Sequence, residues 1–284
     1  MIQIRPVTEL AAFEALEALQ LETWGTPRRV LPARYLAAFQ RSGAALLGAY
    51  QGDRPVGFTI AILGTVDDPT RIDQVAAARL KLYSATMVIH PDFQGQGLGY
   101  RLKLAQRDFA AVIGVRLITW VFDPLIGRNA WLAIGKLGAV SSQYQADYFT
   151  AVDGLAEDRL VAEWWVTGNR ARSRIAGRRG ALSLRAFLDG GARRVNETTA
   201  NEEGWPVPAL RLDAVGASIT LLEIPADFRT LRQVAPALAQ AWRSHVREVL
   251  THTLTQGYLI TDFVRHVEAD GRPRNFYVLT HRNA

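Results

Sequence analysis

Hydrophobic and polar residues along the first 168 positions follow two patterns, one typical of helices and one typical of strands. Apolar residues recur at helical spacing in residues 9–25 and 32–43, and Thr8 is expected to cap the first of these helices. Helical spacing returns after residue 97 and at residues 127–138. Short apolar runs bounded by turn residues predict strands at residues 2–7, 44–51, 54–64, 80–90, 116–124, 141–150 and 158–167. We therefore expect an α/β fold, built from a mixed sheet with helices around it.

The pattern changes near residues 167–169, where we place a domain boundary. Residues 236–256 have helical spacing, with a proline at the expected first turn and a glycine just past the end. Apolar runs predict strands at residues 181–187, 192–198, 219–225, 257–266 and 274–281. The chain is thus expected to have two domains, residues 1–168 and residues 169–284, of which the second is a smaller α+β domain.

The composition indicates a folded protein outside the membrane. Of the 284 residues, 49% are hydrophobic and 21% are charged, as in ordinary globular domains. No apolar run is long enough to span a bilayer, and the N-terminal MIQIRPVTEL lacks the pattern of a signal peptide. The absence of cysteine excludes disulfides, thiolate ligands and a cysteine nucleophile, and His245 and His252 lack a third ligand nearby. We expect a cytoplasmic protein with no metal and no membrane partner.

The net charge of +6 resides in the second half of the chain. Residues 1–168 contain 16 basic and 16 acidic residues, whereas residues 169–284 contain 17 basic and 11 acidic ones. Residues 170–194 alone carry eight arginines against one acidic residue, Asp189. Three interpretations stay open: a solvated linker and sheet edge, a nucleic-acid patch, or cations that bind an acidic substrate or a cofactor phosphate. The stretch has one aromatic residue and no recognisable nucleic-acid module, which counts against a nucleic-acid patch.

Three glycines between residues 95 and 99 separate a predicted strand from a predicted helix, in the sequence HPDFQGQGLGY. Glycine permits positive φ and close approach of another group, and a helix N-terminus favours phosphate. A nucleotide-binding P-loop would need Lys and then Ser or Thr where this chain has Tyr100 and Arg101. A dinucleotide fingerprint would need a third glycine one residue later, close to the first strand of the sheet. The stretch therefore indicates a phosphate-binding loop of another class.

The loop resembles the acetyl-CoA signature Q/R-x-x-G-x-G/A of the GNAT superfamily of N-acetyltransferases. Gln94-Gly95-Gln96-Gly97-Leu98-Gly99 matches the signature, and Met87-Val88-Ile89-His90-Pro91 matches its usual lead-in strand. Asn129 and the sequence Lys136-Leu137-Gly138 resemble the next block of the family, and the element order over about 60% of the chain is similar. The resemblance implies a mostly antiparallel mixed sheet flanked by helices. The C-terminal extension suggests a little-characterised branch.

The resemblance also implies a set of cofactor-binding residues. The backbone amides of the glycine loop would hold the pyrophosphate of coenzyme A, and the preceding strand would hydrogen-bond the pantetheine arm. Asn129 would lie near the pantetheine or the thiol. The full set comprises Met87, Val88, Ile89, Gln94, Gly95, Gln96, Gly97, Leu98, Gly99, Tyr100 and Asn129.

The catalytic acid and base are less well defined by the sequence. The family's usual tyrosine position holds Ile134, so either Tyr144 or Tyr148 protonates the leaving thiolate, or the thiolate leaves unaided. His90 is of a residue type that often acts as a base, but a histidine before proline also commonly has a capping role. Asp123 ends a core strand but also precedes a proline, where a turn role is common.

These observations predict an N-acyltransferase that uses acetyl-CoA or another acyl-CoA, with acetyl as the default acyl group and succinyl as the alternative. The acceptor would be an amine of a small molecule, such as an amino acid, attacking the thioester directly in a ternary complex. The sequence leaves open whether the protein forms a homodimer. The alternatives are a non-catalytic CoA-binding sensor or scaffold, and a nucleic-acid-binding protein that uses Arg178, Arg179, Arg193 and Arg194.

Overall fold

The computed structural model describes residues 1–66, 80–178, 182–208 and 216–282. By contacts between residues, the chain divides into two compact units. The first unit is Met1–Trp120 with Trp165–Thr167, and the second is Val121–Trp164 with Gly168–Ala284. The predicted boundary near residue 168 divides the chain differently, and the assignment of residues 1–168 to one catalytic domain stays a prediction. Residues 66–79, a polar stretch between the strands predicted at 54–64 and 80–90, lie almost wholly outside the described residues.

The first unit contains a sheet in the strand order β1-β2-β3-β4-β5. Neighbouring strands are antiparallel except β4 and β5, which are parallel. The elements are β1 (Ile2–Pro6), α1 (Leu10–Trp24), η1 (Pro27–Arg29), α2 (Ala33–Arg41), β2 (Ala45–Gln51), β3 (Arg54–Thr65), β4 (Leu80–Ile89), η4 (Pro91–Phe93), α3 (Leu98–Val112) and β5 (Leu117–Phe122). The last two residues of β5 belong to the second unit.

Two apolar clusters place helices on both faces of this sheet. In one cluster, Phe13 and Leu16 of α1 and Leu36 of α2 pack against buried residues of β2, β3 and β4. In the other, Leu98 and Leu102 of α3 pack against β2 and β3. Strands β2, β3 and β4 contribute residues to both clusters. The predicted fold class, a mostly antiparallel mixed sheet flanked by helices with a second sheet region toward the C-terminus, is confirmed.

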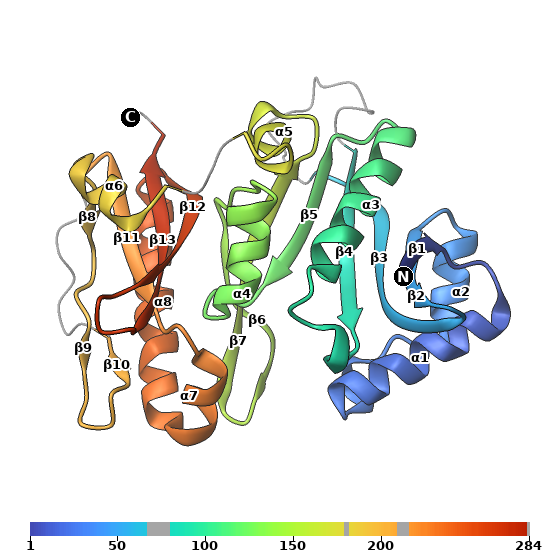
Figure 1. The fold of residues 1–284 in the computed structure, drawn as a ribbon, viewed down its shortest axis with the longest axis horizontal. Helices are drawn as coiled ribbons and strands as arrows, with labels where there is room; N and C mark the ends of the chain where they lie inside the picture. Colours follow the sequence, from blue (N-terminus) through green and yellow to red (C-terminus); the bar gives the residue numbers. More distant parts are fainter. Residues whose placement is uncertain (67–79, 179–181, 209–215, 283–284) are drawn as a thin grey trace. The chain divides into compact units, whose positions relative to one another are not determined.

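The second unit contains a four-stranded sheet in the order β12-β13-β11-β8, with the long helix α8 beside it (Figure 1). Strands β6 and β7 pair as an antiparallel hairpin, and β9 pairs with β10. The elements are α4 (Gly127–Ala130), the π-helix η5 (Trp131–Lys136), β6 (Tyr144–Val152), β7 (Leu155–Trp165), α5 (Asn169–Ile175), α6 (Leu184–Asp189), β8 (Arg193–Arg194), β9 (Thr199–Ala200), β10 (Pro206–Val207), β11 (Ile219–Ile224), α7 (Phe228–Val234), α8 (Pro236–Thr255), β12 (Tyr258–Val267) and β13 (Pro273–His281).

Several predicted elements need correction. Thr8 is not the cap of α1, whose N-cap is Glu9 without a side-chain hydrogen bond. The predicted strand at 181–187 is wrong where the structure describes it: Ser183 accepts a hydrogen bond from the Ala186 amide and starts α6. Of the predicted strand at 192–198, only two residues form β8. The predicted helix at 127–138 continues from α4 as a π-helix, a conformation frequent at functional sites.

Candidate functional site

The strand, glycine loop and helix of the first unit form a continuous structure around residues 87–100. Strand β4 ends at Ile89, η4 follows, and α3 begins at Leu98 with Gly97 as its N-cap. Gln94 Nε2 donates to the carbonyl of Ile89 at 3.0 Å, and Gln96 Nε2 donates to the carbonyl of Asp92 at 2.7 Å. The two glutamine side chains therefore stabilise the loop through hydrogen bonds to nearby backbone carbonyls.

Two glycines of the loop are required by backbone conformation. Gly95 and Gly97 have φ values of 76° and 79°, which side chains other than glycine rarely adopt. A Cβ atom at either position would meet no other atom within 4 Å, so open space lies over the loop. The N-terminal amides of α3 have no acceptor inside the helix. Positive φ, open space and helix amides together fit the pyrophosphate of coenzyme A.

Met87, Val88 and Ile89 pair with β3 along one edge of β4. The ladder between β4 and β5 covers only two registers, Leu82 with Ile118 and Tyr83 with Thr119. In the described part of the chain this ladder ends before residue 87. After these two registers, we expect the edge of β4 on the β5 side to hydrogen-bond an extended ligand. The predicted assignment of this strand to the pantetheine arm stays a prediction.

His90 is buried between the strand and the loop, with 5% of its surface exposed. Its Nδ1 accepts a hydrogen bond from the Asp92 amide at 3.2 Å and caps η4. Its Nε2 lies 2.8 Å from Glu22 Oε1 and 3.0 Å from Arg54 Nη2. Both ring nitrogens are engaged, which favours the capping role over the role of a base.

Asp123, the second candidate base, lies in the second unit and forms an ion pair with Arg243 of α8. Arg243 donates from Nη1 and Nη2 to the two carboxylate oxygens, at 2.9 and 2.7 Å, and the Leu125 amide donates to Oδ1 at 2.9 Å. Only 1% of the Arg243 side chain is exposed. Burial opposes the charge of Arg243, but its hydrogen bonds with Asp123 outweigh this and raise its pKa. Both carboxylate oxygens of Asp123 are thus engaged in hydrogen bonds, which favours a structural role over the role of a base.

Tyr144 donates its phenolic proton to Asp158 Oδ2 at 2.5 Å. Asp158 also accepts from Arg247 Nε at 2.9 Å and Nη2 at 2.5 Å, and from the Asp147 amide at 2.9 Å. Burial and then the hydrogen bond to Asp158 raise the pKa of the Tyr144 phenol well above its ordinary value. Burial opposes the charge of Asp158, but its hydrogen bonds from Arg247 and Tyr144 hold its pKa below the usual range. The Tyr144 proton is therefore tightly held.

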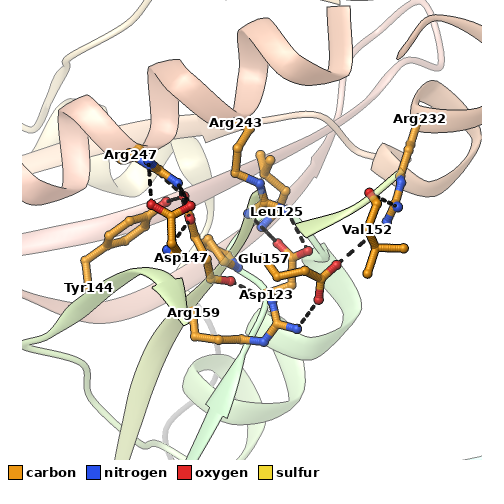
Figure 2. Close-up of polar contacts among 12 residues, drawn as sticks. Asp123, Leu125, Tyr144, Asp147, Val152, Glu157, Arg159, Arg232, Arg243 and Arg247 are labelled. Atoms are coloured by element: carbon orange, nitrogen blue, oxygen red, sulfur yellow. Dashed lines mark hydrogen bonds and ion pairs between the residues drawn. The ribbon is translucent and has the colours of Figure 1, made fainter. Parts of the chain in front are cut away.

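Figure 2 shows how the two ion pairs relate. Arg243 and Arg247 project from α8, four residues apart, toward the segment after β5 and the hairpin of β6 and β7. Asp147 has a positive φ of 50° and also binds Arg247, at 2.9 Å. The predicted candidates Asp123 and Tyr144 are thus brought together by a helix of the C-terminal region. We call Asp123, Tyr144, Asp158, Arg243 and Arg247 the arginine–aspartate cluster.

Tyr148 and Asn129, the other predicted site residues of the second unit, lie on β6 and α4. Tyr148 is 38% exposed, and its ring lies 4.7 Å from that of Phe149 in a T-shaped arrangement. Asn129 lies in α4, and its amide donates to the Ile126 carbonyl at 2.9 Å. Ile134, at the family's usual tyrosine position, is fully buried in the π-helix. The roles that the sequence assigns to Asn129 and Tyr148 stay predictions.

Part of the arginine-rich stretch serves the interior of the second unit. Arg174 forms a buried ion pair with Asp262, and Arg170 Nε donates to the Gly138 carbonyl at 3.1 Å. Arg185 pairs with Asp189 four residues later along α6. The solvated-linker interpretation is wrong for Arg170 and Arg174, and fewer arginines are left for a nucleic-acid surface than the sequence suggests.

Sequence reasoning missed Arg243, Arg247 and Asp158. The two arginines lie one turn apart on a predicted helix, which marks a charged helix face but does not reveal its partners. In the described residues, no cluster of three or more histidine, aspartate or glutamate side chains could hold a metal ion. The helices of the described chain also include none that is long and apolar enough to cross a membrane.

The first unit thus carries a strand–loop–helix site for a phosphate-bearing cofactor. Residues 12–130 match the family model described as the acetyltransferase (GNAT) family. This part of the chain is therefore a GNAT acetyltransferase domain, and the predicted family is confirmed. Because the family consists of acetyl-CoA-dependent acyltransferases, the predicted class of enzyme and cofactor is confirmed at that general level.

Solved structures of acetyltransferases also resemble the chain. The ribosomal-protein-S18-alanine N-acetyltransferase from Escherichia coli is 17% identical, covering 60% of this chain and 97% of its own, with a TM-score of 0.46. Arabidopsis thaliana NAA60 in complex with acetyl-CoA is 14% identical, covering 59% and 100%, with a TM-score of 0.49. YncA from Salmonella typhimurium with acetyl-CoA is 16% identical, covering 60% and 96%, with a TM-score of 0.47. No curated protein matches the sequence.

Proposed function

We propose that the protein is an acyl-CoA-dependent N-acyltransferase that acts on an amine of a small molecule, such as an amino acid. Acetyl is the default acyl group, and succinyl is the alternative. The observation that carries this proposal is the glycine loop, where positive φ at Gly95 and Gly97 combines with open space and the start of α3. In this proposal, the loop amides hold the pyrophosphate and the end of β4 holds the pantetheine arm.

The chain supplies positioning rather than a covalent intermediate. It contains no cysteine, so the acceptor amine attacks the thioester carbonyl directly while both substrates are bound. The C–N bond forms, the C–S bond breaks and the amine loses a proton. Coenzyme A leaves as a thiolate, which is a fair leaving group because a free thiol has a pKa of about 8.5.

The arginine–aspartate cluster bears on how that thiolate leaves. The phenol of Tyr144 is bound to Asp158, and its raised pKa makes it a weak proton donor. Asp123 is bound through both carboxylate oxygens. We therefore favour departure of the thiolate without help from Tyr144. In this proposal, a water molecule or an exposed group such as Tyr148 exchanges the protons.

Calorimetric titration with coenzyme A, acetyl-CoA and succinyl-CoA tests the cofactor part of the proposal. Micromolar binding of an acyl-CoA supports it, and a preference between acetyl and succinyl identifies the acyl group. Gly97→Val should weaken this binding about tenfold because valine cannot readily adopt the φ of 79°. Gly154→Val in the turn between β6 and β7, where φ is 74° and no atom would contact the Cβ within 4 Å, is the matched control.

Turnover separates an enzyme from a CoA-binding sensor. Thiol release from the preferred acyl-CoA, measured across a panel of amino acids and other small amines, should identify an acceptor. Binding without any thiol release would support the sensor. Absence of binding to all three CoA compounds would refute both.

A further inference from the structure

Strand β4 contains an irregularity before its proposed cofactor-binding residues. Against β3, Ile60 pairs with Thr86 whereas Ala61 pairs with Ser84, so Ala85 is an extra residue. Such a β-bulge bends the strand and re-aims the groups that follow it. Here those groups are the backbone amides of residues 87–89, which the proposed function assigns to the pantetheine arm.

Helix α3 contacts the strand on both sides of this bulge through buried polar side chains. Before the bulge, Lys103 Nζ donates to Ser84 Oγ at 2.8 Å. After it, Thr59 Oγ1 of the neighbouring strand β3 donates to the Thr86 carbonyl at 3.0 Å. Gln106 Nε2 in turn donates to Thr59 Oγ1 at 2.8 Å. Two residues one turn apart on α3 thus hold the two ends of the bulge, one directly and one through Thr59.

Burying the side chains of Lys103, Gln106 and Thr59 costs free energy of folding. Lys103 is 2% exposed, and Gln106 and Thr59 are fully buried. Among the described residues, the partners of the Lys103 ammonium are the Ser84 hydroxyl and the ring of Trp120, 3.8 Å away, and neither carries a charge. A buried amine without a carboxylate costs stability, and apolar side chains would fill the same helix face at lower cost. Departures from apolar packing of this kind are typical of functional sites.

We propose that Lys103 and Gln106 are positioning residues that clamp the β4 bulge and so orient the strand amides that receive the pantetheine arm. The inference rests on the proposed function for its ligand. The glycine loop leads into the same helix: α3 starts at Leu98, and Lys103 and Gln106 follow one and two turns later. One helix therefore sets both the loop that holds the pyrophosphate and the strand that holds the pantetheine.

Two ligands distinguish binding of the pyrophosphate by the loop from binding of the pantetheine arm by the strand. Acetyl-CoA engages loop and strand, whereas adenosine 3′-phosphate 5′-diphosphate lacks the pantetheine arm and engages the loop alone. We expect Gln106→Leu, Thr59→Val and Lys103→Met to raise the Kd for acetyl-CoA at least tenfold while changing the Kd for the shorter probe less than twofold. Arg107→Met is the control, since Arg107 is partly exposed on the same helix and pairs with Asp108 rather than with β3 or β4. Equal losses for both probes, or no loss for acetyl-CoA, would overturn the inference.

Hydrogen–deuterium exchange tests the clamp independently of any ligand. Peptides covering β4 should exchange faster in Gln106→Leu and Thr59→Val than in the wild type, and Arg107→Met should leave them unchanged. Unchanged exchange in the first two variants would refute the clamp. If exchange responds as expected but the wild type binds neither probe, the clamp stands and the proposed function fails.

Discussion

Replacing Lys103 with methionine should stabilise the protein most at acidic pH. Burial lowers the pKa of Lys103 from 10.5 to about 7. Below pH 7 the amine is charged in both the folded and the unfolded chain, and the folded state bears the full cost of burying that charge. Between pH 7 and 10.5 the unfolded chain still binds the proton that the folded chain has released. The free energy of unfolding of the wild type therefore rises with pH across this window.

The magnitude follows from the two pKa values. At about 1.4 kcal/mol for each tenfold change in proton affinity, the shift from 10.5 to about 7 corresponds to roughly 5 kcal/mol over the whole window. Between pH 6 and pH 9, the free energy of unfolding of the wild type should rise by about 3 kcal/mol of this total. Methionine has a similar length and carries no charge, so this dependence should vanish in Lys103→Met. The lost hydrogen bond to Ser84 offsets about 1 kcal/mol of the gain at every pH.

Urea denaturation of both proteins at pH 6, 7.5 and 9, followed by far-UV circular dichroism, measures this difference. The advantage of Lys103→Met should fall by about 3 kcal/mol from pH 6 to pH 9. Comparison of variant and wild type at each pH removes the contributions of other titrating groups. An advantage that stays constant from pH 6 to pH 9 would show that the wild-type amine keeps its proton, and would refute the reasoning. A variant that is more stable yet binds acetyl-CoA more weakly would distinguish positioning from general packing.

Three further predictions concern the loop and the arginine–aspartate cluster. Gly97→Val should weaken acetyl-CoA binding about tenfold in calorimetry, since the left-handed backbone costs a branched residue about 1–2 kcal/mol; wild-type affinity would contradict the role of the glycine loop in binding the pyrophosphate. Arg243→Met should lower the free energy of unfolding, measured by urea denaturation, by about 3 kcal/mol because it leaves Asp123 without its ion-pair partner. Adding Asp123→Asn should restore part of the loss, and a single variant as stable as the wild type would contradict this prediction. Tyr144→Phe should lower kcat less than about tenfold with the best amine acceptor; a fall of 10²-fold or more would assign it the role of the acid.

The parts of the site that depend on neighbouring residues were predictable from the sequence. Strand, glycine loop and helix follow one another within residues 80–112, and local rules of periodicity, glycine conformation and helix termini act at that range. The long helix α8 likewise begins at Pro236, where the sequence predicts its first turn. The predicted strand at 181–187 is wrong although the relevant signal is local. Leu182 and Leu184 alternate as in a strand, but Ser183 between them is the N-cap of α6.

The arginine–aspartate cluster could not be predicted because its members are far apart in the sequence. Arg243 and Asp123 are separated by 120 positions, and Arg247 and Asp158 by 89. Charge patterns on one element do not identify the partner on another, and a single sequence carries no further signal. The burial of Lys103 was not predictable from the sequence, because lysine is rarely buried without a charged partner. The structure places it in the interior, where its effect is on β4.

The ion pairs of α8 have a consequence for the order in which the chain can fold. Asp123 and Asp158 emerge from the ribosome long before residues 243 and 247, and Asp158 is fully buried in the native protein. Until α8 has been made, burying these carboxylates would leave them without counter-ions, so the hairpin of β6 and β7 should stay unpacked. A chain ended after residue 168 should stay in that state. Residues 121–164 would then complete their fold only after synthesis of the C-terminal helix.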